Sequence, residues 1–212
     1  MPAIQAEVTV RDLLEDFGPI PARRIRSNPE PGKATEQDVQ NIHLREDRLY
    51  ELIDGVLLEK TMGWFESQVA AWLIYFLQDF LIRNDLGIVS APDGMMRLAP
   101  GLVRIPDVAF VSRERLPGGR PPRESILDLA PDLAVEILSE GNTQKEMQRK
   151  LADYFAAGTR LVWYIDVRKR IVSVYTSPES MTVLDETATI DGANVLPGFR
   201  LAIKELFDRA AN

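Results

Sequence analysis

Two acidic residues in the middle of the chain, Asp107 and Glu136, are placed where they could bind a metal ion. Each lies in a short apolar run that predicts a β-strand, residues 104–112 for the first acid and 132–139 for the second. Burying an ionised carboxylate without a partner costs several kcal/mol, so such a group is paired, hydrogen-bonded or bound to a cation. If the two strands pair, both carboxylates can converge on one hard cation such as Mg²⁺. For either acid alone, a salt bridge or a hydrogen bond at a strand end is the simpler interpretation.

A lysine in the helix predicted after the second strand is the third candidate. This helix opens with a capping box between Thr143 and Glu146 and runs to Ala157, before Gly158. At about 100° per residue, Lys150 lies at the edge of the helix's apolar face, from which its ammonium can reach the two acids. The alternative is a snorkelling lysine, whose stem covers apolar surface while its head stays in water.

The residue types that the chain lacks exclude several kinds of site. Its 212 residues include no cysteine, which rules out a disulfide framework, a thiolate zinc site and a cysteine nucleophile. A multi-histidine metal site would need more than His43, the one histidine, for which we expect a surface or structural role. No nucleophile elbow, P-loop or dinucleotide fingerprint indicates a rival enzyme class.

Charge and hydropathy restrict how the protein can interact with nucleic acid and with membranes. A formal net charge of −7 argues against coating nucleic acid or anionic membrane by bulk electrostatics, although a local basic groove is compatible with it. No apolar stretch approaches the roughly 20 residues of a membrane span, and no secretory signal opens the chain. We therefore expect a cytoplasmic protein that does not enter the membrane.

The elements that must position the three candidates form a mixed α/β pattern. Two short apolar runs around Asp54-Gly55 predict a β-hairpin over residues 50–59. Apolar residues spaced by three and four predict an amphipathic helix over 64–83. We therefore expect an α/β fold with a mixed β-sheet flanked by helices and an N-terminal β-hairpin. Further strands are predicted at 88–98, with a turn at 92–94, at 161–165 and at 171–175, and a closing helix at 204–210.

The N-terminal part of the sequence predicts less regular structure than the rest. A short helix is predicted over 9–16, and the proline-rich segment 19–32 reads as an extended arm. We expect this arm to be solvated or to contact another subunit; its arginines, among them Arg24, are alternatively phosphate contacts. The sequence thus divides into an N-terminal helix and arm, residues 1–47, and a main domain, residues 48–212.

Two further sets of side chains have competing interpretations. Trp163 and the aromatic residues of 65–80 are expected to belong to the core rather than to stack on bases. Arginines of the loop after the first acidic strand either grip a DNA backbone or lie on a solvated loop. They are Arg113, Arg115, Arg120 and Arg123.

Six segments, in this order, resemble the Uma-two family of restriction endonucleases within the PD-(D/E)XK nuclease superfamily. They are Tyr50-Glu51-Leu52-Ile53-Asp54-Gly55, Ile105-Pro106-Asp107-Val108, Asp132-Leu133-Ala134-Val135-Glu136-Ile137-Leu138-Ser139, Lys150-Leu151-Ala152-Asp153-Tyr154, Ala157-Gly158 and Leu161-Val162-Trp163. The resemblance extends over roughly residues 48–176.

The resemblance implies a restriction-endonuclease-like core that hydrolyses phosphodiester bonds with a divalent metal, Mg²⁺ or Mn²⁺. Asp107 matches the acid of the superfamily's proline-aspartate motif and Glu136 the acid of its E-x-K motif, so both are implied metal ligands and catalytic residues. Leu138 takes the place of that motif's lysine, and Lys150 matches the helix lysine thought to substitute for it. Glu51 matches an N-terminal acid that adds a ligand or orients one. Glu66 stands where the family often has a histidine.

Two hypotheses follow. The first is a metal-dependent endonuclease that acts on DNA, as a homodimer so that two sites face two strands. The second is a catalytically degenerate nuclease fold that serves as a nucleic-acid-binding or structural module. The presence of Asp107, Glu136 and Lys150 favours the first hypothesis, and the net negative charge favours the second.

Overall fold

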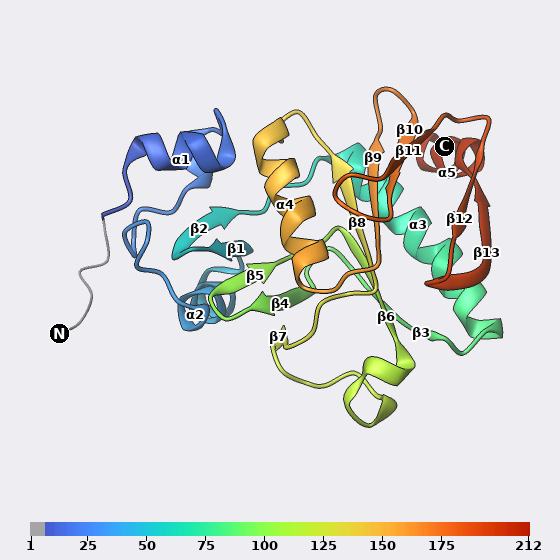
Figure 1. Ribbon diagram of the computed structural model, residues 1–212, viewed down its shortest axis with the longest axis horizontal. Helices are drawn as coiled ribbons and strands as arrows, with labels where there is room; N and C mark the ends of the chain where they lie inside the picture. Colours follow the sequence, from blue (N-terminus) through green and yellow to red (C-terminus); the bar gives the residue numbers. More distant parts are fainter. Residues whose placement is uncertain (1–6) are drawn as a thin grey trace.

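The computed structural model describes residues 7–212, which form two mixed β-sheets with helices on their faces (Figure 1). The larger sheet has the strand order β11-β10-β9-β8-β6-β3, and only its β8–β9 pair is parallel. Its strands are β3 (Gly87–Ser90), β6 (Val108–Ser112), β8 (Leu133–Leu138), β9 (Leu161–Asp166), β10 (Ile171–Tyr175) and β11 (Met181–Leu184).

The smaller sheet has the order β2-β1-β5-β4-β7, and a two-stranded ribbon follows near the C-terminus. The five strands are β1 (Tyr50–Ile53), β2 (Val56–Glu59), β4 (Met95–Ala99), β5 (Leu102–Arg104) and β7 (Ile126–Leu127), and the ribbon is β12 (Thr189–Gly192) with β13 (Leu196–Ala202). The helices are α1 (Val10–Phe17), α2 (Glu36–Glu46), α3 (Trp64–Arg83), α4 (Gln144–Ala156) and α5 (Ile203–Ala211), with 3₁₀ turns η1 (Ala22–Arg24), η2 (Arg113–Arg115) and η3 (Pro117–Gly119).

The two faces of the larger sheet have different coverings. One face packs against α3 and α5 in the main apolar core, which includes the fully buried Trp163. On the other face, Ala134 and Val162 pack against Met147, Leu151 and Tyr154 of α4. Figure 1 shows α4 between this sheet and the strands β1 and β2 of the smaller one. The expected α/β fold with a mixed sheet, flanking helices and an N-terminal hairpin is confirmed.

The hairpin β1–β2 forms through its Asp-Gly turn, as expected. Asp54 and Gly55 both have positive φ, 48° and 75°, which is the conformation that a two-residue hairpin loop of type I′ requires. The turn fixes the register, so that Ile53 pairs with Val56 and Glu51 with Leu58. A side chain at position 55 would also meet the backbone of Gly32 at 2.5 Å.

The predicted strand 104–112 is wrong as a single element. Arg104 ends β5 in the smaller sheet, and β6 begins in the larger sheet at Val108. Pro106 lies between them; it has no N–H to donate to a ladder, so the chain can leave one sheet there and enter the other. Asp107 therefore lies directly before β6, at the junction of the two sheets.

The N-terminal segment also differs from expectation. Segment 19–32 is not a solvated arm, because Arg24 in η1 is buried and Ile25 forms a β-bridge with Leu58. The Arg24 guanidinium donates to both carboxylate oxygens of Glu146, at 2.7 and 3.0 Å. Burial of this pair docks the segment on α4. Residues 1–6 of the predicted N-terminal part lie outside the described residues.

Within residues 7–212, no helix is both long and apolar enough to cross a bilayer.

Candidate active site

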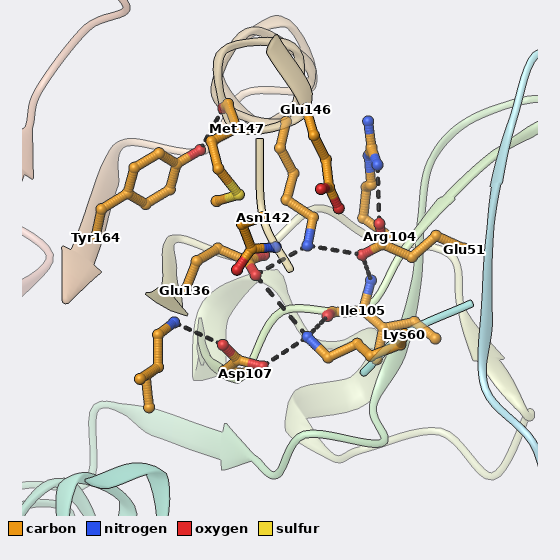
Figure 2. A network of polar contacts seen from close by, with 12 residues as sticks. Glu51, Lys60, Arg104, Ile105, Asp107, Glu136, Asn142, Glu146, Met147 and Tyr164 are labelled. Carbon is orange, nitrogen blue, oxygen red and sulfur yellow. Dashed lines mark hydrogen bonds and ion pairs between the residues drawn. The ribbon is translucent and has the colours of Figure 1, made fainter. Parts of the chain in front are cut away.

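The structure brings together the four residues singled out in the sequence. Glu51 comes from β1, Asp107 from the junction before β6, Glu136 from β8 and Lys150 from α4, and all four are buried. Figure 2 labels Glu51, Asp107 and Glu136 among their polar contacts. They belong to one set of charged and polar side chains, which we call the ion network. Its members are Glu51, Lys60, Arg104, Asp107, Glu136, Lys150, Asp153 and Tyr154.

Strand register explains why the two candidate metal ligands meet. β6 and β8 pair antiparallel with Val108 opposite Val135 and Ala109 opposite Ala134. Directly before this ladder, Asp107 N–H donates to the Val135 carbonyl at 2.9 Å, and Asp107 Oδ2 accepts from Ile137 N–H at 2.6 Å. These bonds to the residues on either side of Glu136 hold the Asp107 carboxylate next to it.

Lys150 lies between two carboxylates. Its Nζ is 2.9 Å from Glu136 Oε2 and 3.0 Å from Glu51 Oε1. The residue is only 4% exposed, so its head is not in water and the snorkelling alternative is wrong. The buried positions of α4 recur at three and four, and Lys150 follows Met147 and precedes Tyr154 on that face.

A second ammonium, from Lys60, lies between the candidate metal ligands. Its Nζ is 2.7 Å from Asp107 Oδ1 and 3.8 Å from Glu136 Oε2, and it donates to the Ile105 carbonyl. The other carboxylate oxygen of Asp107 accepts from Ile137 N–H at 2.6 Å. One cationic head thus contacts both acids, as Figure 2 shows.

Lys60 was absent from the sequence-based candidates, although a signal for it exists. The hairpin register pairs Glu51 with Leu58, and Lys60 N–H donates to the Leu49 carbonyl at 2.9 Å, one step beyond the strands. Lys60 consequently shares the face of Glu51. Counting outward from the Asp54-Gly55 turn would have placed this lysine beside the predicted acid.

The remaining members hold the carboxylates in place. Arg104 donates to Glu51 Oε2 at 2.8 Å and also pairs with Asp153, while Ile105 N–H donates to Glu51 Oε1 at 3.0 Å. The Tyr154 hydroxyl donates to Glu136 Oε1 at 2.5 Å. Every oxygen of Glu51 and Glu136 therefore has a cationic or polar partner.

The two glutamates differ in acidity. Burial raises the pKa of Glu136 above its ordinary value, because the ammonium groups of Lys150 and Lys60 offset only part of the desolvation. Burial would also raise the pKa of Glu51, but the cations outweigh it and lower that pKa to about 2. Burial lowers the pKa of Lys150, yet Glu136 and Glu51 more than reverse this, so its pKa is raised and it is an ammonium at neutral pH.

The donor set fits a divalent cation held by two acids. Asp107 and Glu136 supply hard oxygen ligands, and both contact the Lys60 ammonium as an internal cation. Among residues 7–212, no three Asp, Glu, His or Cys side chains gather as a ready metal cage. Mg²⁺ keeps several of its waters and takes only one or two carboxylates, so the pair suffices for that ion.

The other sequence candidates are not members of this network. Glu66 is in the first turn of α3. Arg113 pairs with Asp85 and Arg115 with the buried Asp132, whereas Arg120 and Arg123 are exposed.

A cleft of about 580 Å³ opens beside the network without containing it. Its floor includes Leu138, two residues beyond Glu136 on the same face of β8, and Tyr164, whose hydroxyl donates to the Met147 carbonyl at 2.7 Å. Arg168 and Lys169 lie at its rim. The cleft is therefore the open surface next to the buried acids.

Comparison with known proteins identifies the class. Residues 37–204 match the Uma2 family, described as "Putative restriction endonuclease", and the chain belongs to this family. A crystal structure of "a putative nuclease belonging to DUF820" from Anabaena variabilis has the same fold, with a TM-score of 0.69 at 21% sequence identity. The alignment covers 77% of this chain and 92% of that one. No curated protein matches the chain significantly.

Proposed function

We propose that this chain is a divalent-metal-dependent endonuclease that hydrolyses phosphodiester bonds in DNA. The observation that carries the proposal is the convergence of the Asp107 and Glu136 carboxylates on one ammonium, that of Lys60. Membership of the Uma2 family supports the reaction class.

Asp107 and Glu136 would hold Mg²⁺ or Mn²⁺. Such an ion supplies a bound water of lowered pKa and a Lewis acid for the phosphate oxygen. Ile137 N–H keeps the Asp107 carboxylate oriented, and the Tyr154 hydroxyl does the same for Glu136. Both ligands are therefore fixed before a cation arrives, which lowers the ordering cost of binding it.

Lys150 supplies the positive charge that phosphoryl transfer requires. Its raised pKa keeps it an ammonium, and an ammonium beside the phosphate stabilises the extra negative charge of the pentavalent transition state. Glu51, held by Arg104 and Ile105, acts as a positioning residue for Lys150. In the reaction, an O–P bond forms from water, the P–O bond to the leaving sugar oxygen breaks, and that oxygen takes a proton.

The substrate would approach from the cleft beside Leu138, because the ion network itself is buried. Arg168 and Lys169 at the rim pair with Glu140 and Asp166 of the same cleft, and they would exchange these acids for a phosphate backbone. A homodimer would present two such sites to the two strands of DNA, and we propose that the protein acts in the cytoplasm.

A second candidate is a catalytically degenerate module that binds nucleic acid or has a structural role. It is favoured by the burial of the network and by the pairing of all its carboxylates with protein cations. Such a module would bind DNA, or a protein, without cutting it.

Nicking of supercoiled plasmid DNA tests the proposal. We expect nicking with Mg²⁺ or Mn²⁺, none with EDTA, and at least a 100-fold loss in Glu136→Gln and Lys150→Ala. Lys145→Ala is the matched control, because this lysine lies on the exposed side of the same helix. Equal nicking by all variants would point to a contaminating nuclease, and binding of DNA without cleavage under any metal would favour the module.

A further inference from the structure

Lys60 and Lys150 both contact Glu136, but they are attached to the fold in different ways. Lys150 belongs to the middle of α4, and its ammonium has a carboxylate within 3.0 Å on each side, Glu51 and Glu136. Lys60 follows β2 in a four-residue connection without regular structure before α3, next to the exposed Thr61. A rotation of the Lys60 side chain would therefore leave the backbone of every helix and strand around the site in place.

Charge balance distinguishes Lys60 further. The network has four carboxylates, on Glu51, Asp107, Glu136 and Asp153, against three cations, on Lys60, Arg104 and Lys150. Its formal charge is thus −1 with the Lys60 ammonium in place and −2 without it. A buried cluster of formal charge −2 matches one divalent ion.

The position of the Lys60 ammonium also matches that of a bound cation. The Lys60 ammonium contacts Asp107 and Glu136 and no other carboxylate of the network. Its third partner is the Ile105 carbonyl oxygen, which is again a hard ligand. The oxygens around this ammonium are those that a metal ion at the same place would use.

We propose that Lys60 is a built-in counter-ion that occupies the cation position of the site and is displaced when a divalent ion binds. This inference rests on the proposed metal site and adds a residue to it. The ammonium keeps Asp107 and Glu136 from facing each other as unscreened like charges, so the fold persists without metal. A metal ion must displace this ammonium, which lowers the affinity of the resting protein for the ion.

The test is direct measurement of Mn²⁺ binding, by calorimetry and by the electron paramagnetic resonance signal of free Mn²⁺. Lys60→Met keeps the apolar stem and removes the charge, and we expect it to bind Mn²⁺ at least tenfold more tightly than the wild type. Its melting temperature should be lower than that of the wild type without metal and should rise more when Mn²⁺ is added. Lys33→Met is the control, because Lys33 is an exposed lysine paired with Glu30, and it should match the wild type.

A second variant covers the case in which Lys60→Met fails to fold without metal. Lys60→Gln retains a hydrogen-bonding amide for Asp107 and the Ile105 carbonyl, and it should also bind Mn²⁺ more tightly than the wild type. If both variants bind Mn²⁺ no more tightly than the wild type, Lys60 is an ordinary structural ion pair and the inference is overturned.

Failure of the metal site itself would look different. Adding Asp107→Asn to Lys60→Met should weaken the tightened Mn²⁺ binding at least tenfold. If the wild type and Lys60→Met bind no Mn²⁺ at millimolar concentration, both the counter-ion role and the metal-dependent function are overturned. If the wild type binds Mn²⁺ through Asp107 and Lys60→Met is no tighter, only the counter-ion role is overturned.

Discussion

Glu51 and Lys150 form a buried ion pair of 3.0 Å that joins the smaller sheet to the helix covering the larger one. The pair connects β1 with α4, and Lys150 also forms an ion pair with Glu136 in β8. The predicted acid and the predicted lysine are thus neighbours in one continuous set of charges.

Glu51→Gln should destabilise the protein by about 3 kcal/mol, because it leaves Lys150 and Arg104 buried with one carboxylate fewer. Urea denaturation of the purified variant measures this difference. Glu30→Gln serves as the control, since Glu30 forms an exposed pair and should change stability by less than about 0.5 kcal/mol. Similar values for the two variants would mean that the buried charges are compensated by water.

The contribution of Glu51 should depend on pH. Its pKa is about 2 in the folded protein against an ordinary value of 4.5, so the folded state favours the ionised form. The stabilisation, roughly 3 kcal/mol, is therefore fully present above pH 4.5 and is lost as the pH falls from 4.5 toward 2. The stability difference between wild type and Glu51→Gln, measured by urea titration from pH 7 to 2.5, should shrink over that interval. A difference that stays constant would contradict the assignment.

Tyr154→Phe should destabilise the protein by about 2 kcal/mol, because Glu136 Oε1 loses the buried hydroxyl that donates to it. The same variant should bind Mn²⁺ more weakly, since one support of the proposed ligand is gone. Tyr75→Phe is the control, because Tyr75 is 56% exposed. Thermal denaturation and Mn²⁺ titration of the two variants give both comparisons.

Arg24→Met should cost about 3 kcal/mol, because Glu146 would be left buried without its guanidinium. Limited proteolysis should then cut the segment before β1 faster than in the wild type. The double variant Arg24→Met/Glu146→Gln should recover most of the lost stability, since no unpaired charge remains. If the double variant is as unstable as the sum of the single ones, the contribution is packing of the arginine stem rather than charge pairing.

Local signals in the sequence were sufficient for the elements that carry them. The Asp54-Gly55 turn sets the hairpin by backbone conformation alone, and the capping box of Thr143 begins α4 where it was expected. Helical periodicity placed Lys150 at the edge of the apolar face of α4. These relationships depend on neighbours a few residues away.

Longer-range relationships were not predictable in the same way. Arg24 pairs with Glu146, which lies 122 residues further along the chain. No residue close to Arg24 in the sequence therefore indicates that it is buried. α2 was not predicted, although Thr35 and Asp38 form a capping box, because only Val39 and Ile42 of its residues are buried and its apolar periodicity is weak. The path from β5 to β6 through Pro106 depends on which sheet each half joins, and this is decided by packing.

The position of the ion network at the contact of the two sheets also restricts how they can be aligned. Apolar contacts have no direction, so they would tolerate a small offset between the sheets. A slip of β1 by one residue would turn Glu51 to the opposite face of the sheet. Lys150 and Arg104 would then be buried without this carboxylate. Each charge left buried without a partner costs several kcal/mol, so the charged groups favour one alignment of the two sheets over alignments shifted by a residue.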